Sequence, residues 1–164
     1  MRFGLFCAPL ANARDHGPET GQGFHDWIDF NVEAEALGFH STFLVEHHFT
    51  GWNQSSASLM MLAALAMRTT TLRVGTAVLV PPWHNPALVA EQAATLDVLS
   101  KGRFDFGIGK GYRHNEFSGF CMPPEEGEAR FEEAIAFLKQ AWASRERFSF
   151  DGRFWKFADV VTEP

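Results

Sequence analysis

Short apolar runs and longer amphipathic stretches alternate through the first two thirds of the chain. The short runs are rich in β-branched and aromatic residues and are bounded by glycine, proline or polar residues, a pattern typical of strands. They predict four buried strands, at residues 2–8, 41–45, 72–80 and 103–108. A further alternating stretch, 148–157, is centred on Asp151-Gly152 and predicts a β-hairpin.

The remaining apolar residues recur three or four positions apart, which predicts four amphipathic helices. In chain order, the first helix carries Trp27, Phe30, Ala34 and Leu37 on one face before Gly38, and the second carries Leu59, Leu62 and Leu65 between a serine cap and Arg68. The third carries Val89, Gln92, Ala93, Leu96 and Leu99 between Asn85-Pro86 and Lys101-Gly102, and the fourth carries Phe131, Ile135, Leu138 and Trp142. Residues 11–23 and 113–124 lack such patterns and are predicted to be loops.

The predicted order is strand then helix, four times over, followed by the hairpin. Such alternation predicts an α/β fold with parallel strands joined by right-handed crossovers. Four βα units are half of a (β/α)8 TIM barrel, for which about 250 residues are typical. We therefore expect residues 1–164 to form a single domain, the N-terminal half of a barrel. A small open sheet is the alternative, but the many aromatic residues favour the half barrel.

Composition and charge limit the kinds of partner. Net charge is −6, and the lysines and arginines are scattered, which argues against nucleic acid and anionic membranes. No apolar run is long enough to span a bilayer, and the two cysteines show no metal-like spacing, so a cytoplasmic location is expected. The 17 phenylalanines suggest either a large core or exposed apolar surface, and the second of these predicts a homo- or heterodimer.

Candidate chemistry gathers where the predicted strands end. Glu46-His47-His48 follows the second strand, and imidazoles titrate near neutral pH. Adjacent residues on a strand point to opposite faces, so Glu46 and His48 are expected on one side and His47 on the other. That geometry disfavours a metal site built from all three residues, and no metal is expected.

The fourth strand runs into Gly107-Ile108-Gly109-Lys110-Gly111, whose backbone amides and lysine suit an anion. A glycine-rich turn with a solvent-exposed lysine is the simpler reading of the same residues. Tyr112, with His114 and Glu116 after it, is a candidate either for a pocket or for a surface loop. On the third strand, Thr76, Ala77 and Val78 are by themselves ordinary core residues.

Several motifs in register resemble the bacterial luciferase-like flavin monooxygenases over nearly the whole chain. They are Glu46-His47-His48-Phe49, Val74-Gly75-Thr76-Ala77-Val78, Asn85-Pro86, the stretch from Ala90 to Asp97, Ser100-Lys101-Gly102-Arg103-Phe104 and Gly107-Ile108-Gly109-Lys110-Gly111-Tyr112. The resemblance implies the first half of an FMN-binding (β/α)8 barrel. It also implies a monooxygenase that uses reduced FMN and dioxygen to oxidise a small organic substrate, with a separate flavin reductase as a possible partner.

The resemblance also implies roles for individual residues. His47 matches the histidine required for oxygen chemistry in the luciferases, supported by Glu46, while Thr76, Ala77 and Val78 would lie under the isoalloxazine. Lys110 stands where luciferase has a phosphate-binding arginine, and Gly109 stands where luciferase has a reactive cysteine. Lysine lacks the bidentate fork of arginine, which is a departure from the family pattern.

Two other functions remain open. One is a deazaflavin-dependent oxidoreductase of the same superfamily, which the absorption spectrum of a bound cofactor would distinguish from an FMN enzyme. The other is a non-catalytic half barrel that binds flavin or another subunit.

Overall fold

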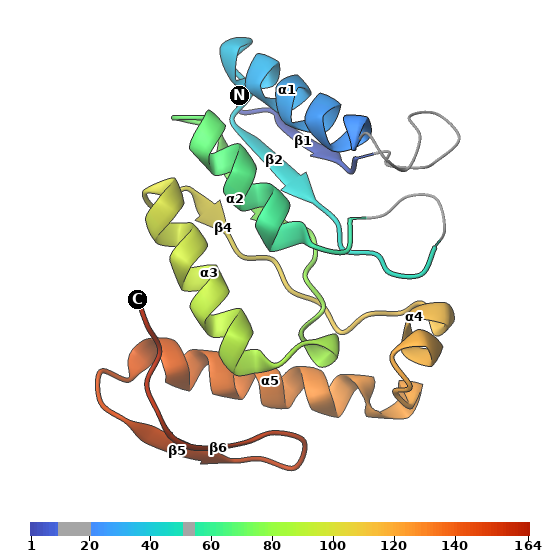
Figure 1. Ribbon diagram of the computed structural model, residues 1–164, viewed down its shortest axis with the longest axis vertical. Helices are drawn as coiled ribbons and strands as arrows, with labels where there is room; N and C mark the ends of the chain where they lie inside the picture. Colours follow the sequence, from blue (N-terminus) through green and yellow to red (C-terminus); the bar gives the residue numbers. More distant parts are fainter. Residues whose placement is uncertain (10–20, 51–54) are drawn as a thin grey trace. The chain divides into compact units, whose positions relative to one another are not determined.

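The computed structural model describes residues 1–9, 21–50 and 55–164. Most of the loop predicted at 11–23 therefore lies outside the described residues, as do residues 51–54. The elements, shown in Figure 1, are β1 (Gly4–Cys7), α1 (Gln22–Ala36), β2 (Ser41–Leu44), α2 (Ser58–Arg68), β3 (Arg73–Thr76), η1 (Pro81–Trp83), α3 (Pro86–Ser100), β4 (Phe104–Asp105), α4 (His114–Gly119), η2 (Pro124–Glu126), α5 (Gly127–Ala143), β5 (Phe148–Asp151) and β6 (Lys156–Val160).

The predicted parallel sheet is confirmed. β1, β2, β3 and β4 lie side by side in chain order, and each neighbouring pair is parallel. The strands are shorter than the apolar runs, because several of those runs continue as irregular chain beyond the ladder. The start of α3 is as predicted: the Asn85 side-chain oxygen accepts the N–H of Ala87 at 2.9 Å, as expected of a cap. The predicted serine cap of α2 is wrong, because Ala57 occupies the cap position and no side chain caps the helix.

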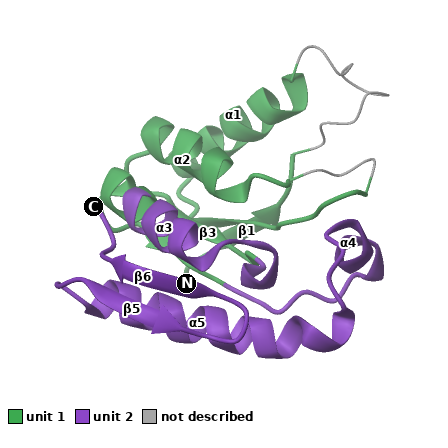
Figure 2. Ribbon diagram, turned by 60° about the horizontal axis from the view of Figure 1, so that its bottom comes forward, with its two compact units in different colours: residues 1–79, 96–107 green, residues 80–95, 108–164 purple. Residues whose placement is uncertain are grey.

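Internal contacts divide the chain into two compact units (Figure 2). Unit 1 comprises residues 1–79 and 96–107, and so contains the whole four-stranded sheet with α1 and α2. Unit 2 comprises residues 80–95 and 108–164, with α4, α5 and the hairpin. α3 begins in unit 2 and ends in unit 1.

The core of unit 1 lies between the sheet and the helices α1 and α2. Its buried apolar residues come from both layers: Trp27, Leu44, Leu62, Leu65, Ala66, Leu72, Val74 and Leu96. In β2, Thr42 and Leu44 are fully buried on this side, whereas Ser41 and Phe43 on the other side are only partly buried. The sheet of unit 1 is thus packed against helices on one face.

The predicted apolar face of α1 is partly wrong. Trp27 and Ala34 are buried, but Phe30 is 51% and Leu37 79% exposed. The buried stripe instead includes Asn31, whose side-chain amide donates to the Trp27 carbonyl at 2.7 Å. A buried asparagine hydrogen-bonded within its own helix carries no apolar signal, so the sequence pattern selected the neighbouring face.

Two charged side chains tie the elements of unit 1 together. The Arg103 guanidinium donates to the carbonyl oxygens of Ala66, Thr69, Leu72 and Ser100 and to the Thr69 hydroxyl, at 2.6 to 3.1 Å. Glu35 on α1 accepts the N–H groups of Thr70, Thr71 and Leu72 at 2.5 to 2.8 Å. Both side chains satisfy backbone groups at element ends, which otherwise lack partners.

In unit 2 the hairpin is confirmed, with β5 and β6 antiparallel. The Phe137 ring of α5 lies 4.5 to 5.8 Å from the rings of Phe148, Phe150 and Phe157. The Glu133 carboxylate accepts the N–H groups of the three loop residues Arg153, Phe154 and Trp155 at 2.8 to 2.9 Å. The hairpin is therefore held to α5 by both aromatic packing and hydrogen bonds.

Two further predictions in unit 2 need correction. The loop predicted at 113–124 contains a short helix, α4, on which Glu116 and Phe117 are buried. The apolar stripe predicted on the last helix is displaced, because Trp142 is 44% exposed while Ala134, Phe137, Leu138 and Ala141 are buried. Alanines form much of that buried face, and alanine contrasts weakly with polar neighbours in a sequence pattern.

Candidate functional site

The carboxyl ends of β2, β3 and β4 are joined side by side within unit 1. The Ala77 N–H donates to the Leu44 carbonyl at 2.9 Å, just beyond the end of both strands. The Thr76 hydroxyl donates to the Gly107 carbonyl at 2.7 Å and accepts the Gly107 N–H at 3.0 Å. A side chain at Gly107 would collide with the Thr76 carbonyl oxygen, so only glycine fits at this position.

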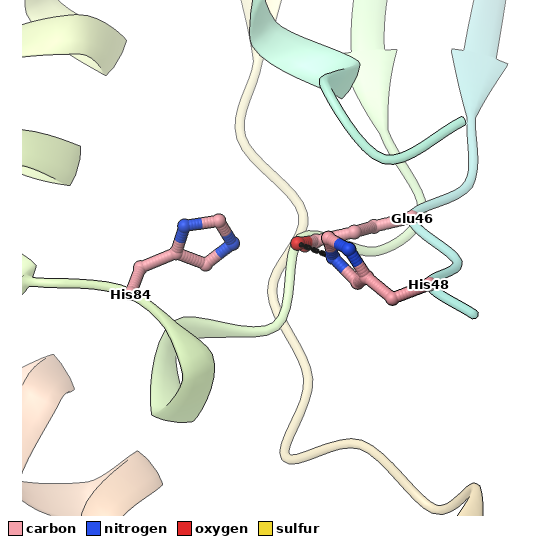
Figure 3. Close-up of side chains that lie close together, drawn as sticks. All are labelled: Glu46, His48 and His84. Carbon is pink, nitrogen blue, oxygen red and sulfur yellow. Dashed lines mark hydrogen bonds and ion pairs between the residues drawn. The ribbon is translucent and has the colours of Figure 1, made fainter. Parts of the chain in front are cut away.

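Glu46 and His48 form a buried pair where the chain leaves β2 (Figure 3). The His48 Nε2 lies 2.7 Å from Glu46 Oε1, and the two side chains are 13% and 1% exposed. The expectation that Glu46 and His48 lie on one side is thereby confirmed. His84, also drawn in Figure 3, belongs to unit 2.

This pair has defined acid–base chemistry. A carboxylate removed from water needs a hydrogen-bond donor, and the imidazole of His48 supplies one. In return the carboxylate fixes the ring orientation of His48 and favours a proton on Nε2. The pair can therefore hold a proton at this end of the sheet. His47, the residue favoured from sequence, is partly buried.

Ala77 and Val78 follow β3 directly. Ala77 is partly buried, Val78 is 37% exposed, and the peptide bond between them is cis. Thr76 is buried, as the core interpretation required, but that interpretation is wrong for Val78. Both side chains therefore keep accessible surface just beyond the end of β3.

Unit 2 contains a cavity of about 310 Å³ that involves two of the predicted site residues. It is lined by Lys110, Gly111, Tyr112, His114, Phe117, Pro124, Glu125, Gly127 and Glu128. Gly111 has a φ of +78°, and a side chain there would meet the Trp83 ring at 2.8 Å. Gly109, the third residue predicted in this stretch, is not among the lining residues.

The charges of this cavity are mixed. Lys110 Nζ lies 3.3 Å from Glu128 Oε2, with the two side chains 57% and 71% exposed. Ion pairs this exposed contribute about 0–1 kcal/mol, so a phosphate could replace the carboxylate at the lysine. Glu125 adds a second carboxylate to the same lining, so an anionic group there would meet one lysine and two carboxylates.

Glu125 and Glu128 were not predicted as site residues. Their sequence signal is a run of acidic residues after Pro123-Pro124 at the start of a helix, which is ordinarily explained by the helix dipole. The structure shows that part of this run also lines the cavity beside Lys110.

No helix among the described residues is long and apolar enough to cross a membrane.

Known proteins resemble this chain throughout its length. The family model for luciferase-like monooxygenase matches residues 1–164. The monooxygenase RslO1 from Streptomyces bottropensis superimposes with a TM-score of 0.90 at 32% identity, covering 100% of this chain and 49% of that protein. An F420-dependent glucose-6-phosphate dehydrogenase from Kineococcus radiotolerans is 37% identical over 81% of this chain and 41% of its own length.

A more distant structure shares the fold. The oxygenating constituent of 3,6-diketocamphane monooxygenase from Pseudomonas putida, in complex with FMN, has a TM-score of 0.86 at 23% identity and is covered over 43% of its length. This chain therefore spans less than half of each of these proteins. The four parallel βα units correspond to about half of their TIM-barrel chains. The chain belongs to the luciferase-like monooxygenase family.

Proposed function

We propose that this chain belongs to an FMN-dependent monooxygenase that oxidises a small organic substrate. It would supply the part of the active site where dioxygen reacts, at the carboxyl ends of the strands. The observation that carries the proposal is the buried Glu46–His48 pair at the carboxyl end of β2. Two similarities support it: RslO1 is a monooxygenase, and the Pseudomonas putida structure contains FMN.

Reduced FMN, when bound, supplies two electrons to dioxygen, so that one oxygen atom enters the substrate and the other leaves as water. The protein side chains have simpler tasks. His48 holds a proton on Nε2 against Glu46, and His47 is the second imidazole available for proton transfer. Ala77 and Val78 offer a surface to a flat ring, while Lys110 offers a cation to a phosphate.

A deazaflavin-dependent dehydrogenase is the second candidate. The observation in its favour is the 37% identity, over 81% of this chain, to an F420-dependent glucose-6-phosphate dehydrogenase. Such an enzyme would transfer hydride without dioxygen. Glu46, His47 and His48 would then position a substrate and not an oxygen species.

Anaerobic titration with reduced FMN and, separately, with F420 tests the choice of cofactor. We expect reduced FMN to bind more tightly, and a dioxygen pulse to reoxidise it. His47→Ala and His48→Ala should keep FMN binding but change the reoxidation rate and the hydrogen peroxide yield by about 100-fold, the usual size of a lost acid–base group. His25→Ala, on the exposed side of α1, is the control.

Preferential binding of F420, without reoxidation by dioxygen, would establish the second candidate. If His47→Ala and His48→Ala both leave the reoxidation kinetics of the unsubstituted protein unchanged, neither histidine takes part in the reaction.

A further inference from the structure

The Thr76 side chain extends the pairing of β3 with β4 beyond the end of their ladder. Among the described residues, these two strands pair at two positions, of which the second is Gly75 with Asp105. Further along, the Thr76 hydroxyl donates to the Gly107 carbonyl oxygen at 2.7 Å and accepts the Gly107 N–H at 3.0 Å. A hydroxyl can do both because it carries one donor and two acceptor positions. It thus replaces the main-chain partner that Gly107 would have in a regular ladder.

Thr76 is buried, whereas the two residues after it are accessible. Thr76 is 1% exposed, and its hydroxyl is already bonded to Gly107 both as donor and as acceptor. Ala77 is partly buried and Val78 is 37% exposed. A ligand at the carboxyl end of β3 would therefore touch Ala77 and Val78, and Thr76 could affect that ligand only through them.

The segment after Thr76 lies between two hydrogen bonds to the same carbonyl oxygen. The Gly107 oxygen accepts the Thr76 hydroxyl before this segment and the Leu79 N–H after it, at 2.7 and 2.9 Å. From the neighbouring strand, the Leu44 carbonyl accepts the Ala77 N–H at 2.9 Å. The segment is thus attached both to the end of β2 and to the chain just beyond β4.

We propose that Thr76 is a positioning residue for the flavin: its hydroxyl fixes the segment of Ala77 and Val78 on which the flat ring packs. The inference rests on the proposed function, in which these two residues contact the ring. A segment that is already held in one conformation needs little further ordering when a ligand binds, so the affinity is higher. Without the Thr76 hydroxyl, Gly107 loses a donor and an acceptor, and the segment loses one of its attachments.

Fluorescence titration of Thr76→Val and Thr76→Ser with oxidised FMN tests this inference. Valine keeps the branched shape of threonine without the hydroxyl, whereas serine keeps the hydroxyl. We expect Thr76→Val to weaken the binding of FMN and of riboflavin equally, by about tenfold, because the segment contacts the ring and not the phosphate. Thr76→Ser should retain most of the affinity for both ligands.

Thr42→Val is the matched control. Thr42 is another buried threonine of the same sheet, and its hydroxyl has no hydrogen-bond partner among the described residues, so flavin binding should not change. Two further measurements separate positioning from a general loss of stability. In Thr76→Val the Gly107 amide should exchange with solvent faster while the amides of α1 do not. The absorption spectrum of the flavin-saturated variant should also move towards that of free FMN.

The outcomes for this inference and for the proposed function can be told apart. Equal flavin affinity and equal spectra in Thr76→Val and the unsubstituted chain would overturn the positioning role and leave the proposed function standing. An equal loss of affinity in Thr42→Val would overturn that role as well. Preferential binding of F420 would end the FMN proposal, and the same variants titrated with F420 would then decide the role of Thr76. Binding of neither cofactor to the unsubstituted chain would overturn both.

Discussion

Glu128 is paired with Lys110, the residue that we propose as the cation for the FMN phosphate. Its carboxylate is 3.3 Å from the ammonium group, and both side chains line the same cavity. Lys110 makes a point-charge contact with no geometric preference, unlike an arginine fork, so it can exchange one anion for another. The affinity of this position for phosphate therefore depends on the carboxylate that competes for the lysine.

Glu128→Gln is accordingly expected to strengthen FMN binding about two- to fivefold, the range that corresponds to an exposed ion pair of up to about 1 kcal/mol. Riboflavin, which lacks the phosphate, should bind equally well before and after the substitution. Glu132→Gln, one turn further along α5 and exposed, is the control for net charge. Fluorescence titration measures both ligands, and an equal gain for riboflavin would show that the phosphate is not involved.

At the same scale, the Glu46–His48 pair shows what local sequence can and cannot reveal. Strand alternation predicted that these two residues share a side, and their hydrogen bond confirms it. The near-complete burial of Glu46 was not predictable from its place at a strand end, because burial is a property of the folded chain. The resemblance drew attention to His47, whereas the geometry adds His48 as the partner of the carboxylate.

Among the elements, α1 is joined to the chain before β3 by Glu35. Burial raises the pKa of this carboxyl, but hydrogen bonds from the N–H groups of Thr71, Leu72 and Thr70 and from the Thr71 hydroxyl outweigh it, so the pKa is lowered overall. A carboxyl with a lowered pKa stabilises the fold above its unfolded-state pKa of about 4.3. That stability is lost as the pH falls through the folded-state value.

We therefore expect Glu35→Gln to reduce the free energy of unfolding by about 1–3 kcal/mol at pH 7, because a charged acceptor of several N–H groups is lost. The difference between the two proteins should shrink as the pH falls below about 4.3. Urea denaturation at a series of pH values measures it. Glu33→Gln, an exposed acidic neighbour on α1, should show neither effect; a pH-independent difference would mean that ionisation of Glu35 is irrelevant.

Arg103 joins the ends of α2 and α3 to the start of β3. Lysine at this position can reach one or two of the five oxygens but cannot reproduce the planar fork, so several carbonyls lose their donor. Arg103→Lys should lower the free energy of unfolding by about 1–3 kcal/mol, as expected when partly buried carbonyl oxygens lose their hydrogen-bond donor. Arg68→Lys, at an exposed pair with Asp29, should change it by less than about 1 kcal/mol in the same thermal or urea assay.

For the whole molecule, the order of strands and helices was predictable because each βα unit carries its own periodic pattern. The sheet order and the hairpin followed from that order and from Asp151-Gly152. What the pattern could not reveal depends on tertiary contacts: the exposed Phe30, the buried Asn31 and the helix α4 within a predicted loop. The single domain over residues 1–164 stays a prediction beside the two units.

The network around Arg103 also bears on how unit 1 opens. Its guanidinium is bonded at once to the last turn of α2, to Ser100 at the end of α3 and to Leu72 ahead of β3. Fraying of any one of these segments would deprive the other two of a shared donor. Local fluctuations here are consequently cooperative, and the amides of all three segments should exchange with solvent as one foldon and not as independent helix ends.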